Sequence, residues 1–203
     1  MGASFTIMKR IILASASPRR REILDTIGIK HEVVVSAYDE SATSADLTPD
    51  MLVLVNSEGK GRAVAKVVED NNSVVISSDT VVAMKKEDGY RVYGKPVDRQ
   101  DAISMLQELS GKVHTVFTGL TIIDKSTGVC ESIVDTTDVV FKELSMDEIE
   151  WYVDTLEPRD KAGSYAIQGL GARFVTSING SYHTVMGLPA HRVYEILSNM
   201  GAL

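Results

Sequence analysis

Cysteine is almost missing from this sequence of 203 residues, in which Cys130 stands alone. A single cysteine excludes an internal disulfide bond and a zinc site built on cysteines. Long apolar runs are missing as well, because no segment approaches the ~20 residues that a membrane-spanning helix needs. The chain also lacks a basic segment followed by an apolar stretch and a cleavage site, so secretion is not expected. These absences predict a cytoplasmic protein without a stable membrane association.

Positive charge is in deficit, since 21 lysines and arginines stand against 28 acidic residues, for a net charge of −7. A broad groove for nucleic acid needs a basic surface, so we expect no nucleic-acid partner. A local cationic pocket is still able to hold a small anion. Hydrophobic residues make up 44% and charged residues 24% of the chain, as in ordinary globular proteins. This composition excludes disorder, collagen and coiled coil as descriptions of the whole chain.

Hydrophobic periodicity and turn signals predict alternating strands and helices, which is typical of a mixed α/β fold. Short strands are predicted at 10–14, 31–36 and 73–78, and residues 80–84 continue or re-enter the sheet after Asp79. A long antiparallel pair is predicted at 113–123 and 129–141. Helices are predicted at 18–28, 48–69, 98–111, 145–156 and 189–199. Hairpin turns are expected at Asp88-Gly89 and at Asn179-Gly180.

The segment after the first predicted strand, SASPRRR at 15–21, places three arginines in the first turn of a helix. Cations there oppose the helix dipole by roughly 0.3–1 kcal/mol each, which a nearby anion would offset. Free N–H groups at a helix N-terminus bind phosphate, and arginine adds charge-assisted hydrogen bonds. A phosphate site is therefore one interpretation of this turn, and a solvated basic turn is the other.

Two acidic residues are candidates for a metal or water site. Asp79 follows an apolar strand, and ligands of open α/β sheets gather at the carboxyl ends of strands. A carboxylate in that place is able to hold a divalent cation or to orient a water. Glu40, in the polar loop after the second strand, would complete a magnesium site with Asp79. The alternatives are a turn cap for Asp79 and an ordinary acidic loop residue for Glu40.

Two lysines stand out by their neighbours. Lys60 lies in a predicted helix between Gly59 and Gly61, although each glycine costs a helix about 1 kcal/mol relative to alanine. The glycine pair indicates a kink or the close approach of another backbone. Lys95 stands in the rigid sequence GKP at 94–96. Neither lysine lies in a Walker A motif, and both have a surface lysine as the alternative interpretation.

Gln168, in AIQG at 166–169, offers a donor and an acceptor on one side-chain amide. Uracil and thymine present an acceptor O4 beside a donor N3–H, so a single amide is able to match both. A hydrogen bond to the local backbone is the alternative role of this side chain.

Several ordered blocks follow one another along the chain: LASASPRR at 13–20, SDT at 78–80, GKP at 94–96, LSGKVH at 109–114, EPRDKAGSYAIQG at 157–169 and VMGLP at 185–189. In combination, they resemble the Maf-like family of nucleoside triphosphate pyrophosphatases. The resemblance covers residues 8–203, which predicts a single domain preceded by an extension at 1–7. That extension begins with MGASFT, which also matches the pattern for N-myristoylation. A simple extension is the alternative.

The resemblance implies a two-lobed α/β fold, similar to that of the enzymes that remove inosine triphosphate. An elongated mixed central sheet would be flanked by helices, with an active-site cleft between the lobes. The cleft would bind a nucleoside triphosphate together with a divalent cation, Mg²⁺ or Mn²⁺. Hydrolysis between the α and β phosphates would then give a nucleoside monophosphate and pyrophosphate. Members of the family are commonly homodimers, so a homodimer is expected.

The resemblance also implies roles for residues near the phosphates. The catalytic aspartate falls on Asp79, as general base or metal ligand, and the loop glutamate falls on Glu40, a second metal ligand. The phosphate-binding lysines fall on Lys60 and Lys95. Where the family usually has alanine after the helical lysine, this chain has Gly61.

Further roles concern the choice of substrate. The N-terminal serine and arginine of the family fall on Ser15 and Arg19. Arg19, Thr80 and Gln168 resemble the set that marks enzymes preferring dTTP and UTP. The resemblance therefore implies hydrolysis of dTTP, UTP and modified pyrimidine nucleotides. The alternative is a nucleotide-binding regulator of cell division without major turnover, after the septum-formation phenotype that gave the family its name.

Overall fold

The computed structural model of the chain describes residues 9–43 and 46–203. The N-terminal extension with its myristoylation pattern lies outside the described residues. Within them, strands and helices alternate in the first half, and long antiparallel strands follow. The strands are β1 (Arg10–Leu13), β2 (Glu32–Val33), β3 (Ser73–Lys86), β4 (Gly89–Tyr93), β5 (Val113–Asp124), β6 (Cys130–Phe141) and β7 (Val175–Asn179). The α-helices are α1 (Pro18–Thr26), α2 (Pro49–Val67), α3 (Arg99–Leu109), α4 (Met146–Asp154), α5 (Tyr182–Met186) and α6 (Ala190–Asn199).

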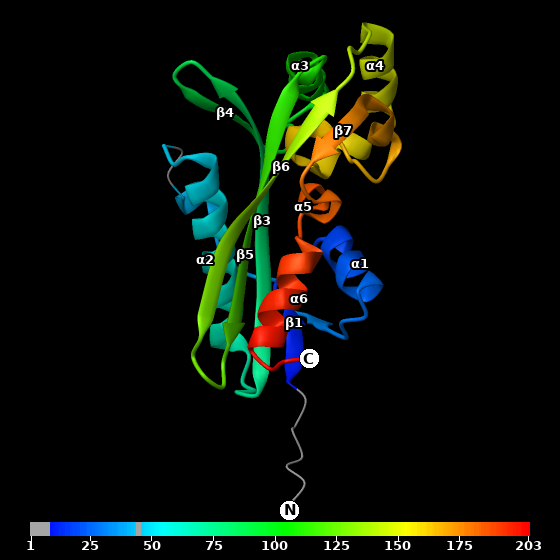
Figure 1. Cartoon of the computed structure of the whole chain (residues 1–203). Coiled ribbons are helices and arrows are strands. Elements are labelled where there is room, and N and C mark those ends of the chain that lie inside the picture. Colours follow the sequence, from blue (N-terminus) through cyan, green and yellow to red (C-terminus); the bar gives the residue numbers. More distant parts are fainter. Residues whose placement is uncertain (1–8, 44–45) are drawn as a thin grey trace, which may run out of the picture.

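In the part of the chain that the structure describes, these strands form one mixed sheet in the order β2-β1-β3-β5-β6-β7, and β4 also pairs with β3. The pairs of β1 with β2 and β3 are parallel, and the others are antiparallel. Figure 1 shows β3, β5 and β6 running along most of the molecule, with helices on both sides of them. The predicted mixed α/β fold, with an elongated sheet flanked by helices, is confirmed.

The two faces of β3 pack against different parts of the chain, because successive side chains of a strand point to opposite faces. Val81 and Ala83 share a core cluster with Val53 of α2. Val82, between them, belongs to the large core cluster on the other face, which includes Tyr165 and the helices α3, α4 and α6. Any two neighbouring residues of β3 therefore reach opposite sides of the sheet.

Helices begin where the sequence supplies caps. Ser145 and Glu148 form a capping box at the start of α4, in which each side chain accepts from the other residue's backbone N–H. The side chain of Asp98 accepts from the N–H of Asp101 at the start of α3. Ser17 directly precedes α1, but its side chain makes no capping bond. None of the helices in the described residues has the length and apolar character of a membrane span.

Two predictions of local structure are wrong. The strand predicted at 31–36 is limited to Glu32–Val33, because β2 pairs only with the short β1, which ends at Leu13. The turn at Asn179-Gly180 does not form a hairpin, since it leads from β7 directly to helix α5. Gly180 is still required there, because its φ of +133° is one that other residues rarely adopt.

Asp79 does not stand at the end of a strand either. The apolar segment at 73–78 and the segment at 80–84 are one continuous strand, β3, with Asp79 near its middle. The reason is the long partner β5, which pairs with β3 without interruption from Val74 to Ala83. The rule that ligands gather at the carboxyl ends of strands holds here for β1, which ends opposite Ile76.

Candidate active site

The candidate site lies where one edge of β3 has no partner strand. On this edge, β1 pairs with β3 as far as Ile76, and β4 begins to pair with it at Val82. The described strands leave residues 77–81 without a partner here, while β5 holds them on the other edge. The chain leaves β1 into the arginine-rich turn and leaves β4 into the GKP loop, so both segments are brought to the gap that exposes Asp79 and Thr80.

A cavity of about 670 Å³ opens at this gap. Its walls come from the turn at 14–20, the loop at 35–40, helix α2, strand β3, the GKP loop and the segments at 160–168 and 185–187. All eight residues predicted for the site line this one cavity, namely Ser15, Arg19, Glu40, Lys60, Asp79, Thr80, Lys95 and Gln168. Residues of the block at 157–169 also line the cavity, among them Asp160, Lys161 and Tyr165.

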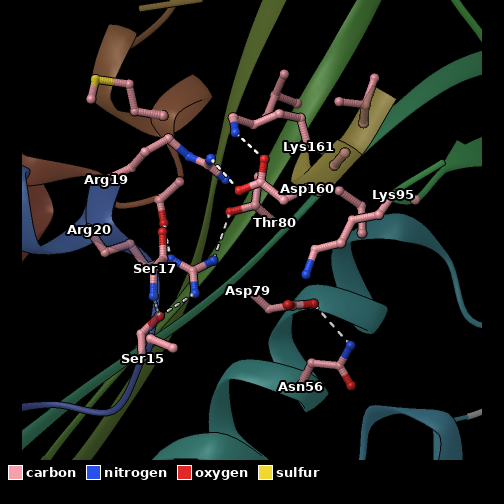
Figure 2. Close-up of a pocket in the computed structure, with 18 of the residues that line it drawn as sticks. Ser15, Ser17, Arg19, Arg20, Asn56, Asp79, Thr80, Lys95, Asp160 and Lys161 are labelled. Carbon is pink, nitrogen blue, oxygen red and sulfur yellow. Dashed lines mark hydrogen bonds and ion pairs between the residues drawn. The ribbon is translucent and has the colours of Figure 1, made fainter. Parts of the chain in front are cut away.

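Four side chains form a compact group on the α2 face of the sheet, which we call the carboxylate cluster: Glu40, Asn56, Lys60 and Asp79. The Lys60 ammonium donates to Asp79 Oδ1 at 2.7 Å and pairs with Glu40 Oε1 at 2.9 Å. The Asn56 amide donates to Asp79 Oδ2 at 2.9 Å, as Figure 2 shows. The side chains of Lys60 and Asp79 are 12% and 10% exposed, so this ion pair is largely shielded from water. One lysine thus holds both carboxylates at the cavity wall.

The glycines around Lys60 let other parts of the chain come close to α2, and the helix continues without a break through both. A Cβ at residue 61 would lie 2.6 Å from the Ser77 hydroxyl, and a Cβ at residue 59 would meet the ring of Tyr38. The predicted close approach is therefore made by side chains rather than by another backbone. It allows Lys60 to lie against β3 with its ammonium next to Asp79.

Thr80 points to the opposite face of β3 and meets a second group of polar side chains. Its hydroxyl lies 3.0 Å from that of Thr118 and accepts from Arg20 at 3.4 Å. Arg20 also donates to Ser15 Oγ at 3.1 Å and to the carbonyl of Gly187 at 2.8 Å. Burial lowers the pKa of the Arg20 guanidinium, an effect that the charge of Asp79 opposes. Arg20 therefore ties the arginine-rich turn to β3 and to the VMGLP motif.

Arg19 and Arg20 point in different directions, which the spacing of the sequence did not reveal. Arg19 pairs with Asp160 at 3.5 Å, and the same carboxylate binds Lys161 (Figure 2). Burial works to raise the pKa of Asp160, but the bond and charge of Lys161 and the charge of Arg19 leave it below its ordinary value. Lys95 reaches into the cavity from the loop after β4, and its ammonium has no protein partner among the described residues.

Gln168 stands on a turn at 166–171 that we call the glutamine turn. The amide of Gln168 is exposed and has no partner within the described chain, so the alternative of a bond to the local backbone is not observed. The turn itself is tightly held. Glu157 accepts from the N–H groups of Leu170 and Gly171 at 3.0 and 3.1 Å. The Tyr152 hydroxyl donates to Glu157 at 2.8 Å and accepts from the Ala166 N–H at 3.1 Å.

The bonds around Glu157 decide its charge. Burial works to raise the pKa of this carboxyl, but the Leu170 N–H, the Tyr152 hydroxyl and the Gly171 N–H together hold it below its ordinary value. Gly169 is required because a Cβ there would meet the Glu157 carboxylate. The glutamine turn therefore presents a free amide on a backbone that Glu157 and Tyr152 hold in place.

His114, from the LSGKVH motif, supports the wall next to this turn. Its Nε2 lies 2.9 Å from the hydroxyl of Tyr165, which lines the cavity. Its Nδ1 has no hydrogen-bond partner in the described chain, and the residue is only 1% exposed. Burial lowers the pKa of His114 to about 4, so the ring is neutral at neutral pH. It is therefore a packing group rather than a cation of the site.

Three residues of the site did not emerge from the sequence: Asn56, Asp160 and Lys161. Asn56 lies four positions before Lys60, which places the two side chains on one face of α2. That spacing was a usable signal for Asn56. Asp160 and Lys161 stand inside the longest motif, but their spacing does not indicate which side chains face the cavity.

The donor set fits a hard divalent cation. Among the described residues, no three His, Cys, Asp or Glu side chains gather as a complete metal site. Asp79 and Glu40 offer two carboxylates at the cavity, and each uses only part of its acceptor capacity on Lys60 and Asn56. Mg²⁺ is commonly held by one or two carboxylates together with substrate phosphates and water. These two residues therefore fit such an ion when phosphate ligands are also present.

Comparison with known proteins agrees with these features. The model of the family described as "Maf-like protein" matches residues 10–200. The chain belongs to the Maf family. The resemblance of its motif blocks to this family is thereby confirmed.

Individual members of the Maf family cover nearly the whole chain. The dTTP/UTP pyrophosphatase of Desulforamulus reducens is 45% identical over 194 residues, covering 96% of this chain and 98% of that protein. The dTTP/UTP pyrophosphatase of Syntrophus aciditrophicus is 43% identical, covering 97% and 93%. Among solved structures, the Ham1 protein of Staphylococcus aureus is a distant likeness at 13% identity and a TM-score of 0.48, covering 95% of this chain and all of that one.

Proposed function

We propose that the chain is a pyrophosphatase that hydrolyses dTTP and UTP, and modified pyrimidine nucleotides, to the nucleoside monophosphate and pyrophosphate. One observation carries the proposal: a single cavity brings together the carboxylate of Asp79, the cations Arg19, Lys60 and Lys95, and the free amide of Gln168. The names of relatives that are 41–45% identical to it support the same reaction and substrates.

The cations would bind the triphosphate. Lys95 has no protein partner in the described chain, so it is available to a phosphate oxygen without breaking an existing bond. Within the described residues, Arg19 has only a long pair with Asp160, at 3.5 Å, and a phosphate would compete for it. Lys60 would offset phosphate charge while it keeps Asp79 and Glu40 together. Ser15, held by Arg20, would offer its hydroxyl at the start of α1.

Asp79 and Glu40 would hold a divalent cation, Mg²⁺ or Mn²⁺, together with phosphate oxygens. When bound, such an ion neutralises phosphate charge and polarises the phosphoryl group. Asp79, as general base or as metal ligand, would orient the attacking water at a carboxylate oxygen. As general base, it would take a proton of that water while the water oxygen bonds to the α phosphorus, the bond from the α phosphorus to the bridging oxygen breaks, and pyrophosphate leaves.

Gln168 would select the base. Its amide has a donor and an acceptor to offer to O4 and N3–H of uracil or thymine, and neither is used by another described residue. Thr80 and Arg19 line the same cavity and complete the set that the family resemblance assigns to pyrimidine preference. A regulator that only binds nucleotide would not need a carboxylate held in place by a lysine and an amide. We therefore favour the enzyme over a regulator of cell division.

The test is pyrophosphate release from dTTP, UTP, CTP, ATP, GTP, ITP and 7-methyl-GTP, each with Mg²⁺ and with a chelator. We expect metal-dependent release from dTTP and UTP, and its loss in the Asp79→Asn variant. Pyrophosphate release from nucleotides with another base would contradict the role of Gln168. Binding of nucleotide by calorimetry without any release would favour the regulator.

A homodimer remains a prediction, and so does the location of the protein in the cytoplasm. Sedimentation of the purified chain tests the first, and fractionation of cells tests the second.

A further inference from the structure

Asn56 connects the loop that carries Glu40 to the carboxylate of Asp79. Its amide oxygen accepts from the Thr43 hydroxyl at 2.7 Å, and its amide nitrogen donates to Asp79 Oδ2 at 2.9 Å. The Thr43 hydroxyl lies 3.0 Å from the hydroxyl of Tyr38. Because the Thr43 proton goes to Asn56, the Tyr38 hydroxyl donates to Thr43. Tyr38, Thr43 and Asn56, which we call the donor chain, therefore all donate in the direction of Asp79.

The donor chain fixes the orientation of both the amide and the carboxylate. An ionised carboxylate only accepts, so the NH₂ group of Asn56 must face Asp79. Asn56 and Asp79 are 5% and 7% exposed, which keeps water from replacing their bond. Lys60, one helical turn after Asn56, holds the other carboxylate oxygen at 2.7 Å. Because Lys60 binds one oxygen of Asp79 and Asn56 binds the other, the carboxylate is held against rotation about its Cβ–Cγ bond, which otherwise rotates easily.

The unusual Gly59 belongs to the same arrangement. A Cβ at residue 59 would lie 2.5 Å from Cζ of Tyr38, so only glycine admits the tyrosine ring against α2. The Ser36 hydroxyl accepts from the Tyr38 N–H and donates to the carbonyl of Lys60, each at 3.2 Å. The loop that carries Glu40 is thus attached to α2 on both sides of Glu40: by Ser36, which precedes it in the chain, and by Thr43, which follows it.

We infer that Asn56 is a positioning residue of the hydrolytic reaction, which sets the rotation of the Asp79 carboxylate and joins it to the Glu40 loop through Thr43 and Tyr38. The inference rests on the proposed function, since it requires that Asp79 takes part in hydrolysis. Loss of Asn56 would leave Asp79 Oδ2 without its donor and free the carboxylate to rotate. A displacement of about 1 Å at a reacting group lowers a rate by about 100-fold.

The first test is the Asn56→Leu variant, which removes both bonds with little change of volume. We expect kcat for UTP to fall about 10- to 100-fold, as for the loss of a hydrogen bond to a charged group. We expect KM for UTP to stay within about threefold, because phosphate and base contacts remain. The control is Ser57→Ala in the next position of α2. Ser57 is fully buried and bonds Leu54 and Thr121 but not Asp79, so its loss should lower thermal stability and leave kcat unchanged.

The second test leaves the helix intact. Thr43→Val removes the hydroxyl at constant shape, and we expect kcat to fall about 2- to 10-fold, as for the loss of a neutral hydrogen bond. Thr43→Ser keeps the hydroxyl, so its kcat should equal the wild-type value. These variants also decide the question if Asn56→Leu fails to fold.

The outcomes separate this inference from the proposed function. If Asp79→Asn keeps wild-type turnover, the assignment of Asp79 fails and the inference fails with it. If Asp79→Asn abolishes turnover but Asn56→Leu and Thr43→Val keep wild-type kcat, only the inference is overturned. It is also overturned if Ser57→Ala lowers kcat as much as Asn56→Leu, since that result indicates a merely structural role. In the Asp79→Asn background, Asn56→Leu should have no further effect on residual turnover.

Discussion

The carboxylate cluster and the glutamine turn are held in opposite ways. In the carboxylate cluster, side chains hold side chains: Lys60 and Asn56 each bind one oxygen of Asp79. In the glutamine turn, the partly buried carboxylate of Glu157 holds backbone N–H groups, and the side chain of Gln168 stays free. The two regions also pack on opposite faces of the sheet. The carboxylate that we propose for the chemistry is thus fixed in advance, whereas the amide that we propose for base recognition is left free on a fixed support.

The largest effect should come from breaking the carboxylate cluster. Asp79→Asn keeps the shape but removes the negative charge and the ability to accept a proton, so kcat for UTP should fall about 10²–10⁴-fold. The variant should still fold at the assay temperature, but its thermal stability should fall, because the new NH₂ group faces one of the two donors Lys60 and Asn56. Pyrophosphate release with folding followed by circular dichroism checks this. Turnover within twofold of the wild type would remove Asp79 from the mechanism.

Acid should weaken the support next to the glutamine turn. The pKa of His114 is about 4 in the folded chain, against about 6.5 in the unfolded chain. Below pH 6.5 the unfolded state binds a proton that the folded state does not, so stability falls as the pH drops from 6.5 to 4. The full loss is about 3 kcal/mol. Urea unfolding at several pH values measures it, and His114→Phe should remove this part of the pH dependence. An unchanged pH slope in that variant would contradict the prediction.

Base recognition should depend on the free amide. Gln168→Ala removes the donor and the acceptor, so the ratio of kcat/KM for UTP to that for CTP should fall about 3- to 10-fold. The maximal rate with UTP should change less, because the carboxylate cluster is untouched. Competition assays with both nucleotides measure the ratio directly. An unchanged ratio would assign base selection to other residues of the cavity.

The smallest effect should come from loosening the turn beneath Gln168. The Glu157 carboxylate accepts from three donors, the Leu170 N–H, the Gly171 N–H and the Tyr152 hydroxyl. Glu157→Gln replaces one of its accepting oxygens with an NH₂ group, which cannot accept. We expect the UTP-to-CTP ratio to fall about threefold, from the loss of roughly one net hydrogen bond. In the Gln168→Ala background the same change should leave the ratio unaltered. A further fall there would mean that Glu157 acts independently of Gln168.

Much of the fold was predictable because its signals are local. The caps at Asp98 and Ser145, the proline at the start of α2 and the turn at Asp88-Gly89 all mark element boundaries correctly. Two of the wrong predictions, the length of β2 and the strand end before Asp79, concern long-range pairing, and the third is the hairpin at Asn179-Gly180. The extent of β2 depends on how far β1 continues, and the continuity of β3 through Asp79 depends on β5, about 40 residues later in the chain.

The residue types of the site, and the family to which they belong, were determined by the sequence alone, since Asp79 and Gln168 stand in recognisable motifs and Lys60 stands between two glycines. Which of them touch was decided only by the tertiary structure. The alternation of side chains along β3 sends Asp79 toward α2 and Thr80 toward Arg20. The gap between β1 and β4 opens both to one cavity, and Asn56 meets Asp79 because glycines bring α2 close to the sheet. Such contacts depend on distances between segments far apart in the chain, which no local pattern encodes.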